Sequence, residues 1–315
     1  MKALLRDEGG VRALEREPLS RHTRFGIGGP AALFAECESE EGFAAAMRAA
    51  RSSGVALTVI GGGSNLVVSD AGFDGLVVRY RGEEMEAEGQ VVRVGAGVEL
   101  QALVDFTIER GLKGLETMTG IPGWVGAAIY GNAGAYGHSI SERVHRVRFW
   151  DGERVREFDN AQCEFAYRES VFKDHKEWTI FSSELQMERG DAAELRRKAD
   201  GIREIRDAKY PPTMKCAGSI FKNCILAELP ESAASVVPAE VIREGKVPSA
   251  WFLEQAGAKG LRRGDIQVAD YHANLIYNDG AGTAADLRAV IVELKQRVRE
   301  RFGLELEEEV QYVGF

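Results

Sequence analysis

The chain has 315 residues, 44% of them hydrophobic and 28% charged, which is typical of a globular protein with two or three domains. Its formal net charge of −9 disfavours general nucleic-acid binding, although a local positive patch would still permit an anionic small ligand. No apolar run reaches the ~20 residues of a membrane-spanning helix, and residues 1–8 become charged too soon for a secretory signal, so a cytoplasmic enzyme is expected.

The cysteines and histidines predict neither disulfides nor a metal site. The cysteines are scattered without CxxC spacing, as expected for free thiols in a reducing compartment. The histidines do not pair at metal-ligand spacing, so we interpret them as structural or solvated and expect no metal. The residues concerned are Cys37, Cys163, Cys216, Cys224, His22, His138, His145, His175 and His272.

Residues 1–82 predict a small α/β lobe. A helix is expected over residues 40–53, because acidic residues occupy its first turn and Gly54 follows its end. The expected strands are residues 31–37, 56–60, 66–68 and 75–79.

A glycine-rich segment joins two of these strands. It consists of Gly61, Gly62, Gly63, Ser64 and Asn65. The glycines let the backbone approach a ligand closely, and the two polar residues add donors, so the segment is a candidate phosphate cradle. A strand rather than a helix follows, and no Gly-Lys-Ser/Thr ending is present, which argues against Rossmann and Walker loops. The alternative is a glycine-rich hairpin without a ligand.

Residues 83–207 predict a second lobe. A strand over residues 91–95 runs into a glycine turn, a helix covers residues 99–110, and strands resume at 144–150 and 178–187. Between them lies a tract of small residues, 119–137, that also contains Asn132 and Tyr136. We favour ligand contact over a mere packing interface, because the tract mixes these polar residues with glycines.

Residues 208–315 predict the last lobe. A charged helix over residues 191–209 ends before Pro211, which marks the boundary. Further helices are expected near residues 250–255 and over 284–301, the latter capped by Thr283 and stopped at Gly303, and a strand over 309–313.

Three local groups of residues could carry chemistry. Residues 209–223 contain three lysines and no acid, and Ala217 and Gly218 would expose Ser219 on a turn, although a serine after glycine is usually only a turn residue. Arg168 lies among aromatic residues, a setting that suits carboxylate recognition, or else forms a surface pair with a glutamate. The acids at 307–309 alternate with apolar residues, which could turn one of them inward for acid–base work.

Taken in order, these segments resemble the UDP-N-acetylenolpyruvoylglucosamine reductase (MurB) family over about residues 20–314. No single motif is decisive, but the ordered set is highly specific. It comprises residues 23–31, 61–66, 120–123, 132–137, 167–170, 217–223, 255–260, 272–274 and 309–310.

The resemblance implies an α+β fold of three domains, in which the first two form an FAD-binding unit of the vanillyl-alcohol-oxidase (PCMH) type and the third binds substrate. It implies a UDP-N-acetylmuramate dehydrogenase that reduces UDP-N-acetylglucosamine enolpyruvate in a cytoplasmic step of peptidoglycan synthesis. FAD would be bound non-covalently, with NADPH as co-substrate. A monomer without nucleic-acid or membrane partners is expected.

The resemblance also assigns residues. Ser219 matches the serine that protonates the substrate carbon next to the carboxylate, and Arg168 and Glu309 match the pair that stabilises the enolate-like intermediate. The implied substrate-binding residues are Lys209, Tyr167, Lys222 and Asn223. The implied cofactor-binding residues are Gly61, Gly62, Gly63, Ser64, Asn65, Leu66, Thr119, Gly120, Pro122, Gly123, Asn132, Gly134, Ala135 and Tyr136.

The chain departs from the family at few positions. Cys224 stands where proline is expected and Ala127 replaces a glycine, and both put turn geometry rather than activity in doubt. The chain between Arg168 and Ser219 is too short for an extra tyrosine-bearing loop, as in the shorter subgroup. Two alternatives stay open: another FAD oxidase or dehydrogenase acting on an alcohol or hydroxy acid, and a non-catalytic nucleotide-sugar-binding protein.

Overall fold

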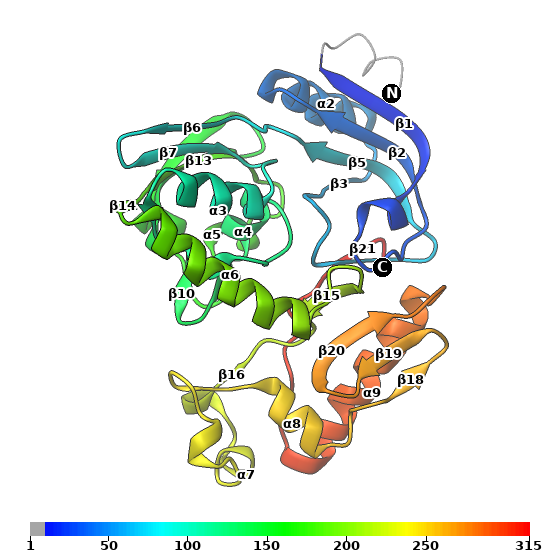
Figure 1. Ribbon diagram of the computed structural model, residues 1–315. Helices are drawn as coiled ribbons and strands as arrows, with labels where there is room; N and C mark the ends of the chain where they lie inside the picture. Colours follow the sequence, from blue (N-terminus) through cyan, green and yellow to red (C-terminus); the bar gives the residue numbers. More distant parts are fainter. Residues whose placement is uncertain (1–9) are drawn as a thin grey trace. The chain divides into compact units, whose positions relative to one another are not determined.

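The chain folds into two compact units in the computed structural model, which describes residues 10–315 (Figure 1). Unit 1 is Met1–Glu17, of which only the part from residue 10 is described, with Ala31–Gly63 and Phe73–Ala208. Unit 2 is Pro18–Pro30, Ser64–Gly72 and Lys209–Phe315. Two short early segments therefore fold with the last third of the chain. The charged residues 1–8, used above to argue against a secretory signal, lie outside the described residues.

The first sheet of unit 1 has the strand order β1-β2-β5-β3. These strands are β1 Val11–Pro18, β2 Pro30–Cys37, β5 Phe73–Tyr80 and β3 Leu57–Val59, and both β2 and β3 pair parallel with β5. The crossover helix α2, Glu40–Ser53, begins at Ser39, whose hydroxyl accepts the Gly42 N–H at 3.1 Å, and ends at left-handed Gly54. Phe43 of α2 packs edge-on against Phe181 at 5.2 Å.

The second sheet of unit 1 is antiparallel, with the order β12-β11-β13-β7-β6. Its strands are β12 Val155–Asp159, β11 Val144–Trp150, β13 Thr179–Gln186, β7 Val91–Gly95 and β6 Met85–Glu88. The helices of this part are α3 Leu100–Glu109, α4 Val125–Tyr130, α5 Val171–Asp174 and α6 Ala192–Lys209. Short strand pairs are formed by β8 Leu112–Lys113 with β14 Glu188–Arg189 and by β9 Gly134–Ala135 with β10 His138–Ser139. Apolar residues of β7, α3, α4, β11 and β13 form one core.

Unit 2 is built on a four-stranded antiparallel sheet, β15-β20-β19-β18. Its strands are β15 Lys215–Ser219, β20 His272–Asn278, β19 Ile266–Ala269 and β18 Arg262–Arg263. The helices are α7 Glu231–Ala234, α8 Ser249–Gln255 and α9 Ala284–Phe302. Two further strand pairs are present. They are β16 Cys224–Ile225 with β17 Lys246–Val247, and β4 Leu66–Val68 with β21 Gln311–Val313. The core of this unit is formed largely by α8, α9 and the inner strands.

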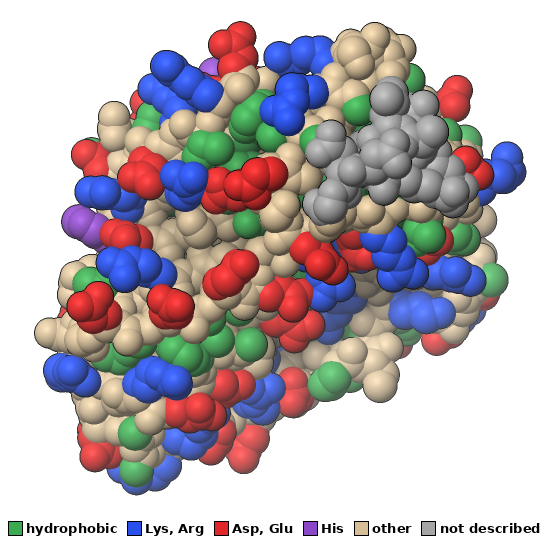
Figure 2. All heavy atoms as spheres, turned by 90° about the horizontal axis from the view of Figure 1, so that it is seen from above, with side chains coloured by type: hydrophobic (Ala, Val, Ile, Leu, Met, Phe, Trp, Pro, Cys, Tyr) green, Lys and Arg blue, Asp and Glu red, His purple; other side chains and the backbone are tan. Residues whose placement is uncertain are grey.

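Short 3-10 helices complete the described chain. They are η1 Leu19–His22, η2 Glu116–Met118, η3 Ile140–Glu142, η4 Ala161–Cys163, η5 Leu226–Glu228 and η6 Ala239–Val241. No helix among residues 10–315 is long and apolar enough to cross a membrane. On the face drawn in Figure 2, acidic and basic side chains are interspersed rather than gathered by sign.

Most of the expected elements are confirmed, and one alternative is wrong. The helices expected at 40–53 and 284–301 are α2 and α9, and the α+β class holds. The glycine-rich segment is not a hairpin, because β3 lies in the first sheet of unit 1 whereas β4 pairs with β21 in unit 2. The three-domain division at residues 82 and 207 stays a prediction.

Candidate active site

The glycine loop of unit 1, Gly61–Gly63, follows directly on β3. Within the described residues, the backbone N–H groups of these three glycines donate no hydrogen bond. Gly63 has a φ of +69°, and a Cβ at Gly62 would lie 2.8 Å from Cδ1 of Trp124. Successive unpartnered N–H groups with no side chain over them fit the requirement for binding the pyrophosphate of a dinucleotide.

Trp124 was not predicted, although it is the one tryptophan in the tract of small residues and could have been noticed for that reason. Its ring lies below the guanidinium groups of Arg79 and Arg81, at 5.4 and 5.7 Å from the ring centroid. Arg79 also forms a 2.7 Å ion pair with Glu36. Burial alone would raise the pKa of Glu36, but the hydrogen bonds and charges of the two arginines hold this pKa below its usual range.

The start of the small-residue tract is held by buried hydrogen bonds. The hydroxyl of Thr119, which is fully buried, donates to the Glu116 carbonyl at 2.8 Å, and the Gly120 N–H donates to Gln101 Oε1 at 2.8 Å. Gly120 and Gly123 have φ values of +75° and +113°, which only glycine adopts readily. Pro122 lies half-buried between them. The tract is therefore a fixed backbone surface rather than a flexible loop.

The end of the tract holds the turn that carries Tyr167 and Arg168. Asn132 Nδ2 donates to the Ala166 carbonyl at 2.8 Å, and an Arg168 guanidinium nitrogen donates to the Gly134 carbonyl at 3.0 Å. Arg168 also lies 5.2 Å from the Tyr167 ring centroid. Unit 1 thus brings predicted cofactor-binding and catalytic residues together.

Three residues of this region adopt left-handed backbone conformations that are strained for side chains. The φ values are +41° for Asn132, +54° for Tyr136 and +60° for Arg168. Such strain costs of the order of 1–3 kcal/mol per residue and is concentrated at functional sites. Lys173 supports the turn, because its ammonium donates to the Arg168 carbonyl at 2.7 Å and pairs with Glu169 at 3.0 Å. Tyr136 is half exposed, at 49%, and Ala135 pairs with His138.

Ser219 of unit 2 lies at the end of β15, so the turn expected around it is corrected to a strand with an irregularity. The register of β15 against β20 shifts between Cys216 and Ser219, and Gly218 in that shift has a φ of +76°. Glycine permits this conformation, which a side chain there would strain. The Ser219 hydroxyl lies 3.4 Å from the hydroxyl of Tyr210, a residue that sequence reasoning missed.

Glu309 lies beside the same segment. Its N–H donates to the Ile220 carbonyl at 2.7 Å, and the Lys222 N–H donates to the Glu307 carbonyl at 2.9 Å. Unit 2 therefore brings the segments of Ser219 and Glu309 side by side. The buried Lys222 ammonium pairs with exposed Glu307, and Asn223 is exposed just before β16.

Asn65, which precedes β4, is joined to the segment that contains Glu309 and the start of β21. Its side-chain amide donates to the Glu309 carbonyl at 2.8 Å, and its own carbonyl accepts the Gln311 N–H at 2.9 Å. Its neighbours Ser64 and Leu66 are half-buried. The parallel pairing of β4 with β21 explains this arrangement, because it starts at Leu66 and Gln311.

Lys209 ends α6, and its ammonium lies 5.2 Å from the Tyr210 ring centroid. The Tyr210 ring in turn meets His272 edge-on at 6.2 Å. Burial, followed by the charge of Lys209, lowers the pKa of His272 to about 4, so this imidazole is neutral at pH 7. Sequence reasoning placed Lys209 near the substrate but gave no role to Tyr210 or His272.

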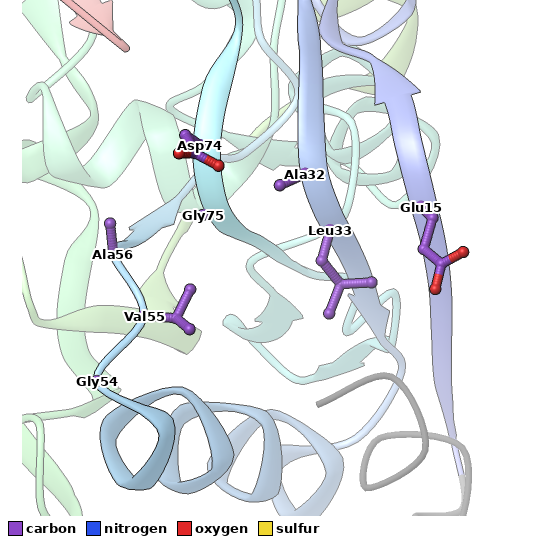
Figure 3. A pocket seen from close by; sticks show the side chains of 8 residues that line it. All are labelled: Glu15, Ala32, Leu33, Gly54, Val55, Ala56, Asp74 and Gly75. Atoms are coloured by element: carbon purple, nitrogen blue, oxygen red, sulfur yellow. The ribbon is translucent and has the colours of Figure 1, made fainter.

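A separate shallow hollow of about 550 Å³ lies on the first sheet of unit 1 (Figure 3). It contains none of the predicted site residues, and its two charged lining residues, Glu15 and Asp74, are acidic and thus unsuited to a phosphate. Across residues 10–315, no group of three or more His, Cys, Asp or Glu side chains could hold a metal ion.

Comparisons with known proteins identify the family of this chain. A family model described as an FAD-binding domain matches residues 31–155, and one described as the C-terminal domain of UDP-N-acetylenolpyruvoylglucosamine reductase matches residues 210–313. The reductase of Solibacter usitatus is 68% identical over 297 residues, covering 94% of this chain and 95% of the relative. That of Carboxydothermus hydrogenoformans is 38% identical over 99% of both chains.

A solved structure is also similar over nearly the whole chain. The crystal structure of UDP-N-acetylenolpyruvylglucosamine reductase (MurB) from Thermus caldophilus matches with a TM-score of 0.74 and 28% identity, covering 96% of this chain and 99% of the other. The fold, the donor-rich glycine loop and the matched FAD-binding domain define a flavin-dependent oxidoreductase. Within that class, the chain belongs to the UDP-N-acetylenolpyruvoylglucosamine reductase family.

Proposed function

We propose that the protein reduces UDP-N-acetylglucosamine enolpyruvate to UDP-N-acetylmuramate with NADPH as the reductant, in a cytoplasmic step of peptidoglycan synthesis. Family membership supports the reduction itself and the use of FAD. The observation that supports the residue assignment is the hydrogen bond from the Glu309 N–H to the Ile220 carbonyl, which joins the segments that carry Ser219 and Glu309.

FAD, bound non-covalently, would supply hydride chemistry at the methylene carbon of the enolpyruvyl group. The Gly61–Gly63 loop would hold its pyrophosphate, because the free N–H groups there can replace water without adding protein charge. The other proposed cofactor contacts are Ser64, Asn65, Leu66, Thr119, Gly120, Pro122, Gly123, Asn132, Gly134, Ala135 and Tyr136. Tyr167, Lys209, Lys222 and Asn223 are proposed to bind substrate.

Ser219 would complete the reduction by donating its hydroxyl proton to the carbon next to the carboxylate. Serine is a weak acid, so it can protonate only a strongly basic, enolate-like centre. Arg168 would stabilise the negative charge that develops on the carboxylate, together with Glu309 as its partner. The strained backbone and the hydrogen bond to Gly134 would hold Arg168 in place before the charge develops.

Ser219→Ala tests this assignment by separating the two half-reactions. Flavin reduction by NADPH should keep its rate, because no proton is transferred to substrate in that step. Reoxidation by the enolpyruvyl substrate should slow by at least about a thousandfold, within the usual range for loss of a general acid. Ser219→Cys should restore part of that rate, since a thiol also carries a transferable proton. Equal losses in both half-reactions would refute the role.

A further inference from the structure

We propose that Asn274 is the positioning residue that fixes Ser219 for proton transfer. The inference rests on the proposed function, because it requires Ser219 to be the proton donor. The two residues lie on neighbouring strands of one sheet, where Ser219 pairs with Leu275, the residue after Asn274.

Strand β15 pairs irregularly with β20 just before Ser219. The ladder against β20 is interrupted between Cys216 and Ser219, and Gly218 there is left-handed. Beyond the irregularity the ladder resumes, because Ser219 pairs with Leu275 and the Ile220 N–H donates to the Asn274 backbone carbonyl at 3.2 Å. This short stretch of ladder leaves room for a further group to fix the position of the Ser219 segment.

The side chain of Asn274 supplies that group. Its Oδ1 accepts the N–H groups of Ile220 and Phe221, at 3.2 and 2.9 Å, and these are the two residues directly after Ser219. Its Nδ2 donates to the Phe221 carbonyl at 2.8 Å. One amide thus binds three successive peptide units, which restricts both their position and their orientation.

The Asn274 clamp, meaning the Asn274 amide with its bonds to Ile220 and Phe221, is buried, and all of its polar groups have partners. The second Nδ2 hydrogen is donated to the Ser249 hydroxyl at 2.8 Å, and that hydroxyl in turn donates to the Phe221 carbonyl at 3.3 Å. Asn274 is 2% exposed and Ser249 is fully buried. A buried, fully satisfied network of this kind specifies one geometry, because any displacement leaves a polar group without a partner.

The clamp is connected to both proposed catalytic segments of unit 2. Asn274 Oδ1 accepts the Ile220 N–H, and the carbonyl of the same residue accepts the Glu309 N–H at 2.7 Å. Asn274 therefore orients one short segment to which both Ser219 and Glu309 are attached. A small rotation of this segment would move the serine hydroxyl away from the carbon it protonates, and proton transfer is sensitive to such misplacement.

The chain offers a matched control on the same strand. Asn278 is also buried, at 5% exposure, and its amide likewise binds backbone: Nδ2 donates to the Phe25 carbonyl at 3.1 Å, and Oδ1 accepts the Gly280 and Gly282 N–H groups at 3.1 and 2.9 Å. It does not hold the Ser219 segment. Asn278→Asp should therefore have a similar structural cost without the positioning effect.

The test compares Asn274→Asp with Asn278→Asp in the FAD-loaded protein. Aspartate keeps the size and one acceptor oxygen but replaces the donor to the Phe221 carbonyl with a second acceptor. For each variant, the thermal midpoint and both anaerobic half-reaction rates are measured. Asn274→Asp should slow reoxidation by the enolpyruvyl substrate at least about tenfold and leave reduction by NADPH within about twofold. Asn278→Asp should leave both rates within about twofold of wild type.

Equal reoxidation rates for the two variants at similar thermal midpoints would overturn the positioning role. If Asn274→Asp does not fold, Ser249→Ala is used in its place, because this variant removes only the hydroxyl that supports the Asn274 amide. Ser249→Ala should slow reoxidation by a few-fold and leave reduction by NADPH unchanged. An unchanged reoxidation rate would overturn the inference. The proposed function fails in a different way: then wild type itself is not reoxidised by the substrate, or Ser219→Ala is reoxidised at the wild-type rate.

Discussion

Gly62→Ala is the sharpest test of the glycine loop as a flavin-binding element. The added Cβ would lie 2.8 Å from Cδ1, 3.0 Å from Nε1 and 3.1 Å from Cγ of Trp124, whereas ordinary contact begins at 3.4 Å. The loop and the indole must therefore separate by at least 0.6 Å, the difference between 3.4 and 2.8 Å. The contacted atoms belong to a rigid ring beside Arg79 and Arg81, so the loop is the part expected to move.

Overpacking of this kind costs about 1–3 kcal/mol. If the displaced loop must return to its present conformation to bind FAD, the dissociation constant rises by about 5- to 150-fold, since ~1.4 kcal/mol corresponds to a factor of ten. The assay is a fluorescence titration of flavin-free protein with FAD. Far-ultraviolet circular dichroism should stay unchanged, because the substitution lies outside helices and strands.

Two further variants test whether contact with Trp124 causes the loss of FAD affinity. Gly61→Ala places a Cβ 3.7 Å from the Ala127 side chain, an ordinary contact, so its FAD affinity should stay within about threefold of wild type. Trp124→Ala in the Gly62→Ala background removes the obstacle and should recover most of the lost affinity. Equal FAD affinities for Gly61→Ala and Gly62→Ala, or no recovery on removing the indole, would refute the steric argument.

Three other predictions follow from burial. Burial and, second, the charge of Lys209 lower the pKa of His272 from 6.5 to about 4, so between these pH values the unfolded chain binds more protons than the folded chain. The free energy of unfolding should therefore fall by up to about 3 kcal/mol as the pH drops from 6.5 to 4. His272→Gln should flatten this pH dependence, as measured by urea titrations. Phe252→Ala in the unit 2 core, where Phe252 is fully buried, should cost about 3–5 kcal/mol of unfolding free energy. Burial raises the pKa of Cys37 to about 12 and of Cys224 to about 11, so neither thiol should react with a disulfide reagent at pH 8 until urea unfolds the chain.

The periodic elements could be predicted from the sequence because their signals are local. Helix α2 has its Ser39 cap, acidic first turn and terminal glycine within one short stretch, and its limits were obtained correctly. Strand β4 was also located correctly, but its partner was not. Its pairing with β21 joins residues more than two hundred positions apart, and no local pattern encodes such a contact.

In the candidate site, too, the features with a local sequence signal could be predicted and those that depend on tertiary contacts could not. The glycine loop was recognisable because three successive glycines are a local signal for close approach of the backbone to a ligand. Trp124 was not predicted, and Asn274 was noted only within the segment 272–274, since the contacts of the indole with the loop and of the amide with the Ser219 segment follow only from three-dimensional packing. The turn expected at Ser219 was wrong because a glycine after alanine also permits an irregular strand end, and pairing with β20 selects the strand.

Anaerobic stopped-flow absorbance at the flavin band follows both half-reactions in one experiment. The wild-type protein is mixed first with NADPH and then with UDP-N-acetylglucosamine enolpyruvate. NADPH should bleach the flavin band, and the enolpyruvyl sugar should restore it rapidly, with UDP-N-acetylmuramate as the product. Bleaching that persists after the sugar is added would contradict the proposed function.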